Sequence, residues 1–264
     1  MSIELKGASF AYPGGFMANK NLNLTILAGE RLAIVGQNGA GKTTAVKLMN
    51  GLHKPVEGDV LVDGQNTKEH TTAQIARTVG YVFQNPDDQI FNQSVRAEIE
   101  YMPRYFKLPQ AEIDRRVERA VGLTGLEGYL KKNPFDIPYP IRKFVSIAAV
   151  LATEPKYVIF DEPTAGQDRR GTLLLESMME QLQGEGITVI TITHDMEFVA
   201  RNFNRVVAMA HGNILADGTA RSIFGAAAVV AEARLRKPQL GELAGRLGLS
   251  EDILFCNELV AALD

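Results

Sequence analysis

The feature that most restricts the possible folds of this chain is the segment GQNGAGKT, from Gly36 to Thr43. It follows the apolar run RLAIVG, which is typical of a buried strand, and it precedes TTAVKLMNGL, which has helical character. Glycines in such a loop let successive N–H groups point inward at phosphate oxygens, and the helix adds the positive end of its dipole. The pattern G-x-x-x-x-G-K-[ST] between a strand and a helix therefore predicts a nucleotide site. In it, Lys42 reaches the β- and γ-phosphates and Thr43 holds Mg²⁺.

Other side chains near this loop complete the predicted nucleotide contacts. Tyr12 lies in the first expected hairpin and could stack on adenine, although an aromatic residue in a strand more often has a packing role. Besides Tyr12, Lys42 and Thr43, the residues expected to contact the nucleotide are Gly36, Asn38, Gly39, Ala40, Gly41 and Thr44.

Two later runs, KYVIFDE and ITVITITHD, are β-branched and almost continuously apolar. Such runs suit parallel strands covered on both faces, and helices over 169–183 and 196–202 are expected to accompany them. SIELKGASFAY and NLNLTILAG instead alternate apolar and polar residues, as half-buried antiparallel strands do, and RVVAMAHGNILADG indicates a closing hairpin. The fold class expected is therefore α/β, a parallel core with an antiparallel β subdomain.

Polar residues follow the ends of these predicted strands, where α/β sheets bind their ligands. Asp161 is expected to bind Mg²⁺, and Glu162 to orient and deprotonate the attacking water. His194 would contact the γ-phosphate and the water, and Gln84 would hold Mg²⁺ or the water if correctly placed. Asp168 lies just after the turn that follows Glu162.

Composition narrows the class of protein further. Hydrophobic residues make up 45% of the 264, which is enough for a sizeable core. The net charge of −3 without a long basic run argues against nucleic acid as the main ligand. Neither a signal sequence nor a run of about 20 apolar residues is apparent, so we expect a cytoplasmic protein that docks peripherally on a membrane partner. Cys256 is the only cysteine, which excludes an internal disulfide.

Taken together, these motifs resemble the ATP-binding-cassette (ABC) family of ATPases, over Ser2 to about Gly225. The resemblance is carried by the phosphate loop, Gln84, the Asp161–Glu162 strand end, Asp168 and His194, with Tyr12 at the place of the family's adenine-stacking aromatic residue. FQNPDDQIF, DEPTAGQD and RKPQLGELAGRLGL further resemble the ATPase subunits of energy-coupling factor importers of vitamins, cobalt or nickel. The resemblance implies ATP and Mg²⁺ as cofactors, ATP hydrolysis, and integral membrane transporter subunits as partners.

One motif departs from the family. Its LSGGQ signature aligns with Ile137-Pro138-Tyr139-Pro140-Ile141, as the downstream VSIAAVLA fixes. In the family, two cassettes pair head to tail and each signature contacts the nucleotide on the other's phosphate loop. Residues before proline avoid the helical region, so Ile137 and Tyr139 are expected to be extended, with Pro140 at the first helical position. We therefore favour a heterodimer with an ATPase that carries an intact signature, and keep a homodimer as the alternative.

The domain division expected is an ABC ATPase domain over 1–225, with a helical subdomain at 93–156, and a helical dimerisation appendage over 226–264. A soluble ABC-type ATPase, or a nucleotide sensor that is not coupled to transport, remains the alternative function. Glu162 and His194 argue against a sensor, and the absence of sustained heptads after Gln84 argues against a DNA-repair type.

Overall fold

The computed structural model describes residues 1–250 and 252–263, and the chain divides into two compact units. Unit 1 consists of Met1–Leu27, Arg31–Glu69 and the chain from Ile190 onward, and unit 2 of Ala28–Glu30 and His70–Val189. Both contain strands and helices, which confirms the α/β fold class. The expected boundaries at 93–156 and 226–264 stay a prediction.

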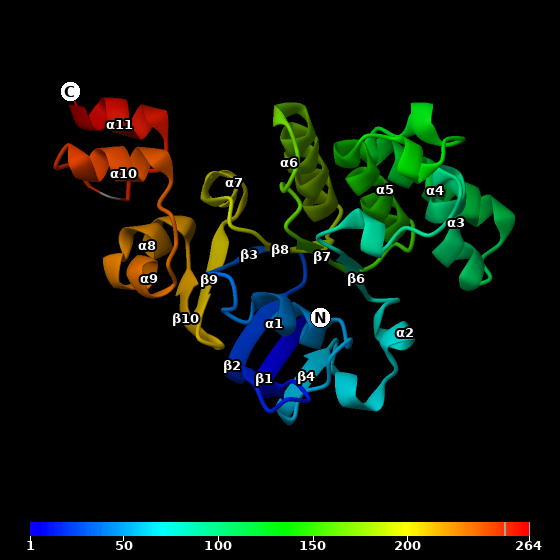
Figure 1. Ribbon diagram of the computed structural model, residues 1–264, viewed down its shortest axis with the longest axis horizontal. Coiled ribbons are helices and arrows are strands. Elements are labelled where there is room, and N and C mark those ends of the chain that lie inside the picture. Colours follow the sequence, from blue (N-terminus) through cyan, green and yellow to red (C-terminus); the bar gives the residue numbers. More distant parts are fainter. Residues whose placement is uncertain (251, 264) are drawn as a thin grey trace. The chain divides into compact units, whose positions relative to one another are not determined.

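Unit 1 contains an antiparallel sheet with the strand order β2-β1-β4-β5 (Figure 1). Its strands are β1 (Ser2–Ala11), β2 (Met17–Leu27), β4 (Glu57–Val62) and β5 (Gln65–Asn66). Ile3 pairs with Ile26 on one side and Val62 on the other, and all three side chains are buried. The alternating pattern in the sequence thus predicted β1 and β2 correctly, because one face of the sheet is covered. Helix α1 (Lys42–Met49) packs against this sheet.

A second group of strands in unit 1 carries the phosphate loop. β3 (Arg31–Val35) pairs in parallel with β9 (Arg205–Ala210), which pairs antiparallel with β10 (Asn213–Gly218). The two-residue turn of this hairpin has φ of 52° at His211 and 79° at Gly212, which matches the right-handed twist of its strands. The predicted closing hairpin is therefore confirmed. Helix α7 (Met196–Asn202) precedes β9, and helix α8 (Ala220–Gly225) follows β10 and contacts both β9 and β10.

The last part of unit 1 is a small helical segment, shown in orange and red in Figure 1. It contains α9 (Ala227–Glu232), α10 (Gln239–Arg246) and α11 (Cys256–Leu263). Ala244, Ile253 and Leu259 form its own buried cluster. Other apolar side chains stay exposed, namely Leu243, Leu247, Val260 and Leu263.

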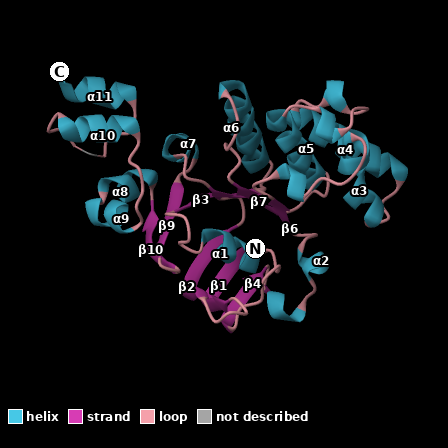
Figure 2. Ribbon diagram, viewed as in Figure 1, coloured by secondary structure: helices cyan, strands magenta, loops and turns pink. Residues whose placement is uncertain are grey.

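Unit 2 joins a parallel strand pair to a group of helices. β6 (Val79–Val82) pairs with β7 (Tyr157–Asp161), and all five residues of β7 are buried. Between these strands the described chain is helical and contains no strand, as the sequence predicts; Figure 2 shows this group. The helices of unit 2 are α2 (Thr72–Ile75), α3 (Val95–Tyr105), α4 (Gln110–Thr124), α5 (Tyr139–Leu151) and α6 (Arg169–Gly184). α3, α4 and α5 pack against one another.

β8 (Thr188–Ile192), also fully buried, has residues in both units. Over the described residues, no helix combines the length and the apolar character that crossing a bilayer requires.

Candidate active site

The phosphate loop of unit 1 needs glycine at two of its positions. Gly36 has φ 149°, and a Cβ there would lie 2.2 Å from the carbonyl oxygen of Met209. Gly41 has φ 96°, and its Cβ would lie 2.5 Å from the amide nitrogen of Asn19. Both contacts are far shorter than van der Waals distance, so the curled backbone that exposes N–H groups depends on glycine here.

Lys42 begins α1 and folds its side chain back over the loop. Its ammonium donates to the carbonyl oxygens of Gly36 at 2.7 Å and Gln37 at 2.9 Å, and the residue is 7% exposed. Of the described side chains none caps α1 by a hydrogen bond, and its first turn has no acidic residue. A bound phosphate would therefore meet first-turn N–H groups, a favourable helix dipole and an ammonium for which it is a stronger, charged acceptor.

Tyr12 is anchored beside α1. Its hydroxyl lies 3.1 Å from the Thr44 hydroxyl, and its ring makes edge contacts with Phe10 and His53, which stack on each other with centroids 4.4 Å apart. Burial lowers the pKa of His53, which favours a neutral imidazole in this aromatic cluster. The Tyr12 ring is 39% exposed. Its role as an adenine-stacking residue stays a prediction.

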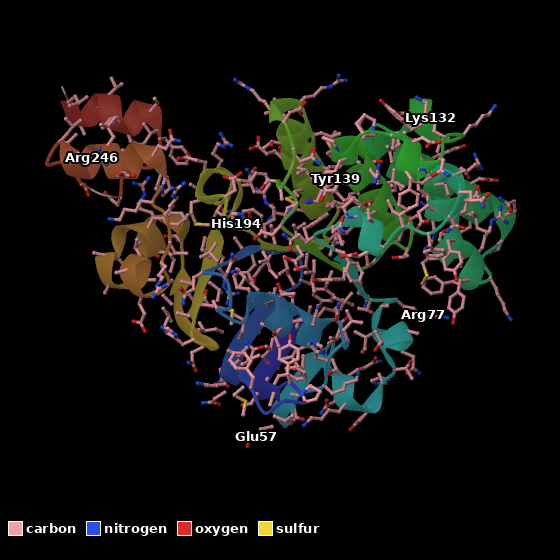
Figure 3. The ribbon with its side chains drawn as sticks, in the orientation of Figure 1. Glu57, Arg77, Lys132, Tyr139, His194 and Arg246 are labelled. Carbon is pink, nitrogen blue, oxygen red and sulfur yellow. The ribbon has the colours of Figure 1, made fainter. Side chains whose placement is uncertain are left out.

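His194, labelled in Figure 3, lies on the loop between β8 and α7. Its side chain is exposed. The loop is fixed on its far side by Asp195, whose carboxylate accepts from the N–H of Phe198 at 2.9 Å and so caps α7. The N–H of Asp195 donates to the Thr193 hydroxyl at 3.0 Å. The backbone on either side of His194 is therefore held by local hydrogen bonds.

The two acidic residues of unit 2 lie where β7 ends. Asp161 is its last residue and is 5% exposed. Its Oδ2 accepts a 2.7 Å hydrogen bond from Tyr81 on the neighbouring β6. Burial, together with the Asp161 charge, raises the pKa of Tyr81, so the phenol remains a donor at neutral pH. Glu162 follows in the left-handed conformation with φ 49° and is 7% exposed.

Gln84 follows the end of β6 and Asp161 ends β7, so both lie at the carboxyl ends of neighbouring parallel strands of unit 2. Gln84 is exposed. The loop that carries it is held by Gln89, which accepts from the N–H of Phe83 at 3.1 Å and donates to the carbonyl of Ser146 at 3.0 Å. Sequence reasoning did not identify Tyr81 or Gln89, because nothing in the local pattern distinguishes them from solvated polar residues.

The start of α5 replaces the signature, and one expectation about it is wrong. Ile137 is extended, as predicted, with φ −106° and ψ 151°. Tyr139, however, is the first residue of the helix, and Pro138 precedes it as the extended N-cap, so Pro140 occupies the second helical position. The Pro138 carbonyl accepts the first helical bond from the N–H of Arg142 at 2.9 Å. Because first-turn N–H groups have no intrahelical acceptor, a proline at the second position loses no hydrogen bond.

This helix start packs on the loop that follows Glu162. A Cβ on Gly166 would lie 3.0 Å from the ring of Tyr139, and the Gln167 amide donates to the Pro140 carbonyl at 3.0 Å. Asp168 then accepts from the N–H of Gly171 at 2.8 Å and caps α6. The predicted loop residue Asp168 therefore has a helix-capping contact in this structure.

The two basic residues after the helix start are held by other groups of unit 2. Arg142 pairs with Asp87 at 2.8 Å and also donates to carbonyl groups of the preceding turn. Lys143 is fully buried, and its ammonium donates to the carbonyls of Glu162 and, at 3.2 Å, Ala165. Burial lowers the pKa of Lys143 to about 8, although the charges of Glu162 and Asp161 oppose the shift.

The predicted residues thus fall into two sets. Unit 1 carries the phosphate loop, Tyr12 and His194, and unit 2 carries Gln84, Asp161 and Glu162. The predicted Mg²⁺ ligands are a hydroxyl, an amide and a carboxylate, which are the hard oxygen donors that this ion prefers. Asp161 offers a carboxylate at the end of β7, and the hydrogen bond from the Tyr81 phenol fixes the orientation of that carboxylate.

Comparisons with known proteins identify the family of the chain. A family model described as ABC transporter matches residues 19–165. A putative ABC transporter ATP-binding protein of Pyrococcus furiosus is 42% identical over 94% of both chains. The energy-coupling factor transporter ATP-binding protein EcfA of Methanothermobacter thermautotrophicus is 36% identical over 94% of this chain and 80% of its own length.

A solved structure is similar over almost the whole chain. It is cbiO1 from Clostridium perfringens, described as part of the ABC transporter complex cbiONQ. The TM-score is 0.79 at 34% identity, and the match covers 92% of this chain and 98% of that one.

Proposed function

Because the chain belongs to the ABC transporter family of ATP-binding subunits, we propose that it hydrolyses ATP to power a membrane importer of the energy-coupling factor type. The observation that carries the ATPase assignment is the phosphate loop, with its two obligatory glycines and the buried Lys42. Relatives named EcfA, and the likeness to a part of the cbiONQ complex, support the importer type. A vitamin or a transition-metal ion is the cargo that this type implies.

The residues proposed to contact the phosphates and the adenine lie in unit 1. The N–H groups of the loop and of the first turn of α1 receive the phosphates, and Lys42 moves from its two carbonyl acceptors to the β- and γ-phosphates. Tyr12 stacks on the adenine. Mg²⁺, when bound, neutralises charge on the phosphates, and Thr43, Gln84 and Asp161 are the residues that would hold it.

Hydrolysis is assigned to Glu162. A carboxylate that is almost fully buried and held at a strand end can take a proton from the attacking water, while Gln84 and His194 orient that water and the γ-phosphate. A positioned base of this kind contributes on the order of 10² to 10⁴ in rate.

Pairing is proposed to be with a second ATPase subunit of different sequence. A working signature offers a Ser hydroxyl and Gly N–H groups to the nucleotide of the partner, whereas Pro138 and Pro140 have no N–H. The Tyr139 ring fills space at Gly166 and is 39% exposed. We therefore propose that ATP bound by this chain turns over against an intact signature, while ATP on the partner turns over about 100-fold more slowly through loss of charge-stabilising donors.

The test inactivates each glutamate separately in the assembled transporter. Glu162→Gln should stop most ATP turnover while ATP stays bound, and the same change in the partner's glutamate should matter less. Glu180→Gln, an exposed glutamate on α6, is the matched control and should leave turnover unchanged. Equal effects of the two glutamates, or brisk turnover by a homodimer of this chain, would contradict the unequal pair. Unchanged turnover in Glu162→Gln would remove Glu162 from the mechanism.

Docking on the membrane subunits is proposed to use an aromatic surface of unit 2. Phe91 and Tyr101 are 60% and 42% exposed, and their rings meet edge to face with centroids 4.7 Å apart. Exposed aromatic pairs of this kind are common at protein interfaces. The double change Phe91→Ser and Tyr101→Ser should prevent co-purification with membrane subunits and leave ATP binding intact. Leu173→Ser, at an exposed leucine on α6, is the control.

Purification from native membranes distinguishes the proposed transport function from the alternative of a soluble ATPase or sensor. Peripheral association with the cytoplasmic face of the membrane, through integral subunits that can be identified in the purified complex, is the expected result. A chain that purifies from membranes and cytosol without integral partners would instead favour the alternative.

A further inference from the structure

A fully buried lysine on α5 has no part in the roles assigned so far. Lys143 has 0% of its surface exposed, which is rare because an ammonium loses its hydration on burial. A buried ammonium is retained only where hydrogen bonds replace that hydration. The acceptors identified for it are two main-chain carbonyls, those of Glu162 and Ala165.

These acceptors belong to the tight turn that begins at Glu162. Glu162 has φ 49°, a left-handed conformation that is unfavourable for a residue with a side chain. The turn's own bond, from the N–H of Ala165 to the Glu162 carbonyl, is long at 3.3 Å. The Lys143 ammonium donates to the carbonyls at both ends of this turn and so ties the turn to α5.

The same helix start contacts the next residues of the loop. Tyr139 packs on Gly166, and Gln167 donates to the carbonyl of Pro140. The segment 162–167 is therefore attached to α5 at three places, and Lys143 provides the one that holds the main chain of Glu162 itself.

We propose that Lys143 is a positioning residue for hydrolysis, which holds the main chain of Glu162 so that its carboxylate stands where the base is needed. The inference rests on the proposed role of Glu162. Lys143 lies on α5, the helix that begins at the altered signature. It therefore also connects the main chain of Glu162 to the helix whose start would face the nucleotide of the partner.

The test compares Lys143→Met and Lys143→Gln in the assembled transporter, with the exposed Lys131→Met as control. Methionine has a similar volume but no donor, and glutamine has a donor on a chain one atom shorter, which reaches one of the two carbonyls. Because a displacement of about 1 Å can cost on the order of 100-fold in rate, kcat should fall at least about 10-fold in Lys143→Met and about threefold or more in Lys143→Gln. The dissociation constant and KM for ATP should stay within twofold of wild type, since binding uses unit 1.

The measured kcat of these variants decides whether Lys143 positions Glu162. A kcat within twofold of wild type in Lys143→Met overturns the proposal, as does a loss confined to the amount of folded complex with normal kcat per folded molecule. If Lys143→Met does not assemble, Lys143→Gln alone decides by the same criterion. Glu162→Gln is assayed in parallel: if it turns over normally, the proposed role of Glu162 fails, whereas a dead Glu162→Gln beside a normal Lys143→Met refutes only the role of Lys143.

Discussion

The buried ammonium of Lys143 makes the stability of the chain depend on pH in a direction opposite to that of most surface lysines. Its pKa is lowered from 10.5 to about 8 in the folded chain, because burial removes the hydration of the charge. In the unfolded chain the side chain is hydrated and titrates at its ordinary value. Between these two pKa values the unfolded state binds a proton that the folded state does not.

The sign and the size of the effect follow from this difference. Stability rises with pH wherever the unfolded state binds more protons, so the chain should gain stability as the pH rises from about 8 toward 10.5. A shift of about 2.5 units corresponds to about 3.4 kcal/mol in total. Of this, about 1.3 kcal/mol should appear between pH 7 and pH 9.

The assay is guanidinium unfolding of the nucleotide-free chain at pH 7, 8 and 9, with EDTA present, for wild type and Lys143→Met. All other groups titrate in both proteins, so the difference in unfolding free energy isolates Lys143. The unfolding free energy of wild type should increase relative to that of Lys143→Met as the pH rises.

Lys131→Met, an exposed lysine in the same unit, is the matched control and should show no such change with pH. A difference between wild type and Lys143→Met that stays constant from pH 7 to pH 9, or that moves in favour of the variant, would refute the assignment of a lowered pKa to Lys143.

Three further predictions concern unit 1. Lys42→Ala should weaken ATP binding about 100-fold in calorimetry, because two charge-assisted hydrogen bonds are worth about 3 kcal/mol, and equal affinities would contradict the phosphate-loop assignment. Gly41→Ala should weaken ATP binding and lower the melting temperature, since its Cβ would lie 2.5 Å from the amide of Asn19 at φ 96°; an unchanged melting curve would show that the loop tolerates a side chain there. Deleting 226–264 should make pairing of two ATPase subunits weaker or dependent on ATP, which light scattering would show, and normal assembly would count against a dimerisation role.

Much of the fold follows from local sequence patterns. The hairpin of 205–218 was predicted from two apolar runs around His211–Gly212–Asn213. In the structure its turn is His211 and Gly212, both with positive φ, and Asn213 begins β10. The phosphate loop was recognised because its constraints act between residues that are close in sequence. Glycines at fixed positions, a strand before them and a helix after them are all visible in one short segment.

The helix start at Tyr139 shows where local rules fall short. The rule that a residue before proline avoids the helical region predicted an extended Tyr139, yet the helix begins there. The ring of Tyr139 packs on Gly166, and the carbonyl of Pro140 accepts from Gln167. Contacts with a segment 27 positions away in the sequence thus accompany the helical conformation of Tyr139, which the Tyr139-Pro140 dipeptide alone disfavours.

By itself the sequence determined the element order, the phosphate loop, the acidic pair at the end of β7 and the loss of N–H donors at Pro138, since each depends on neighbouring residues. Only the tertiary structure decided which partners hold that pair. Tyr81 donates to Asp161 across 80 positions of the chain, and Lys143 is buried against the Glu162 carbonyl. Nothing in the sequence around Lys143, which follows Arg142, indicates that its ammonium is buried. Its burial is set by the packing of α5 on the loop after β7, a long-range contact that residue type and spacing do not encode.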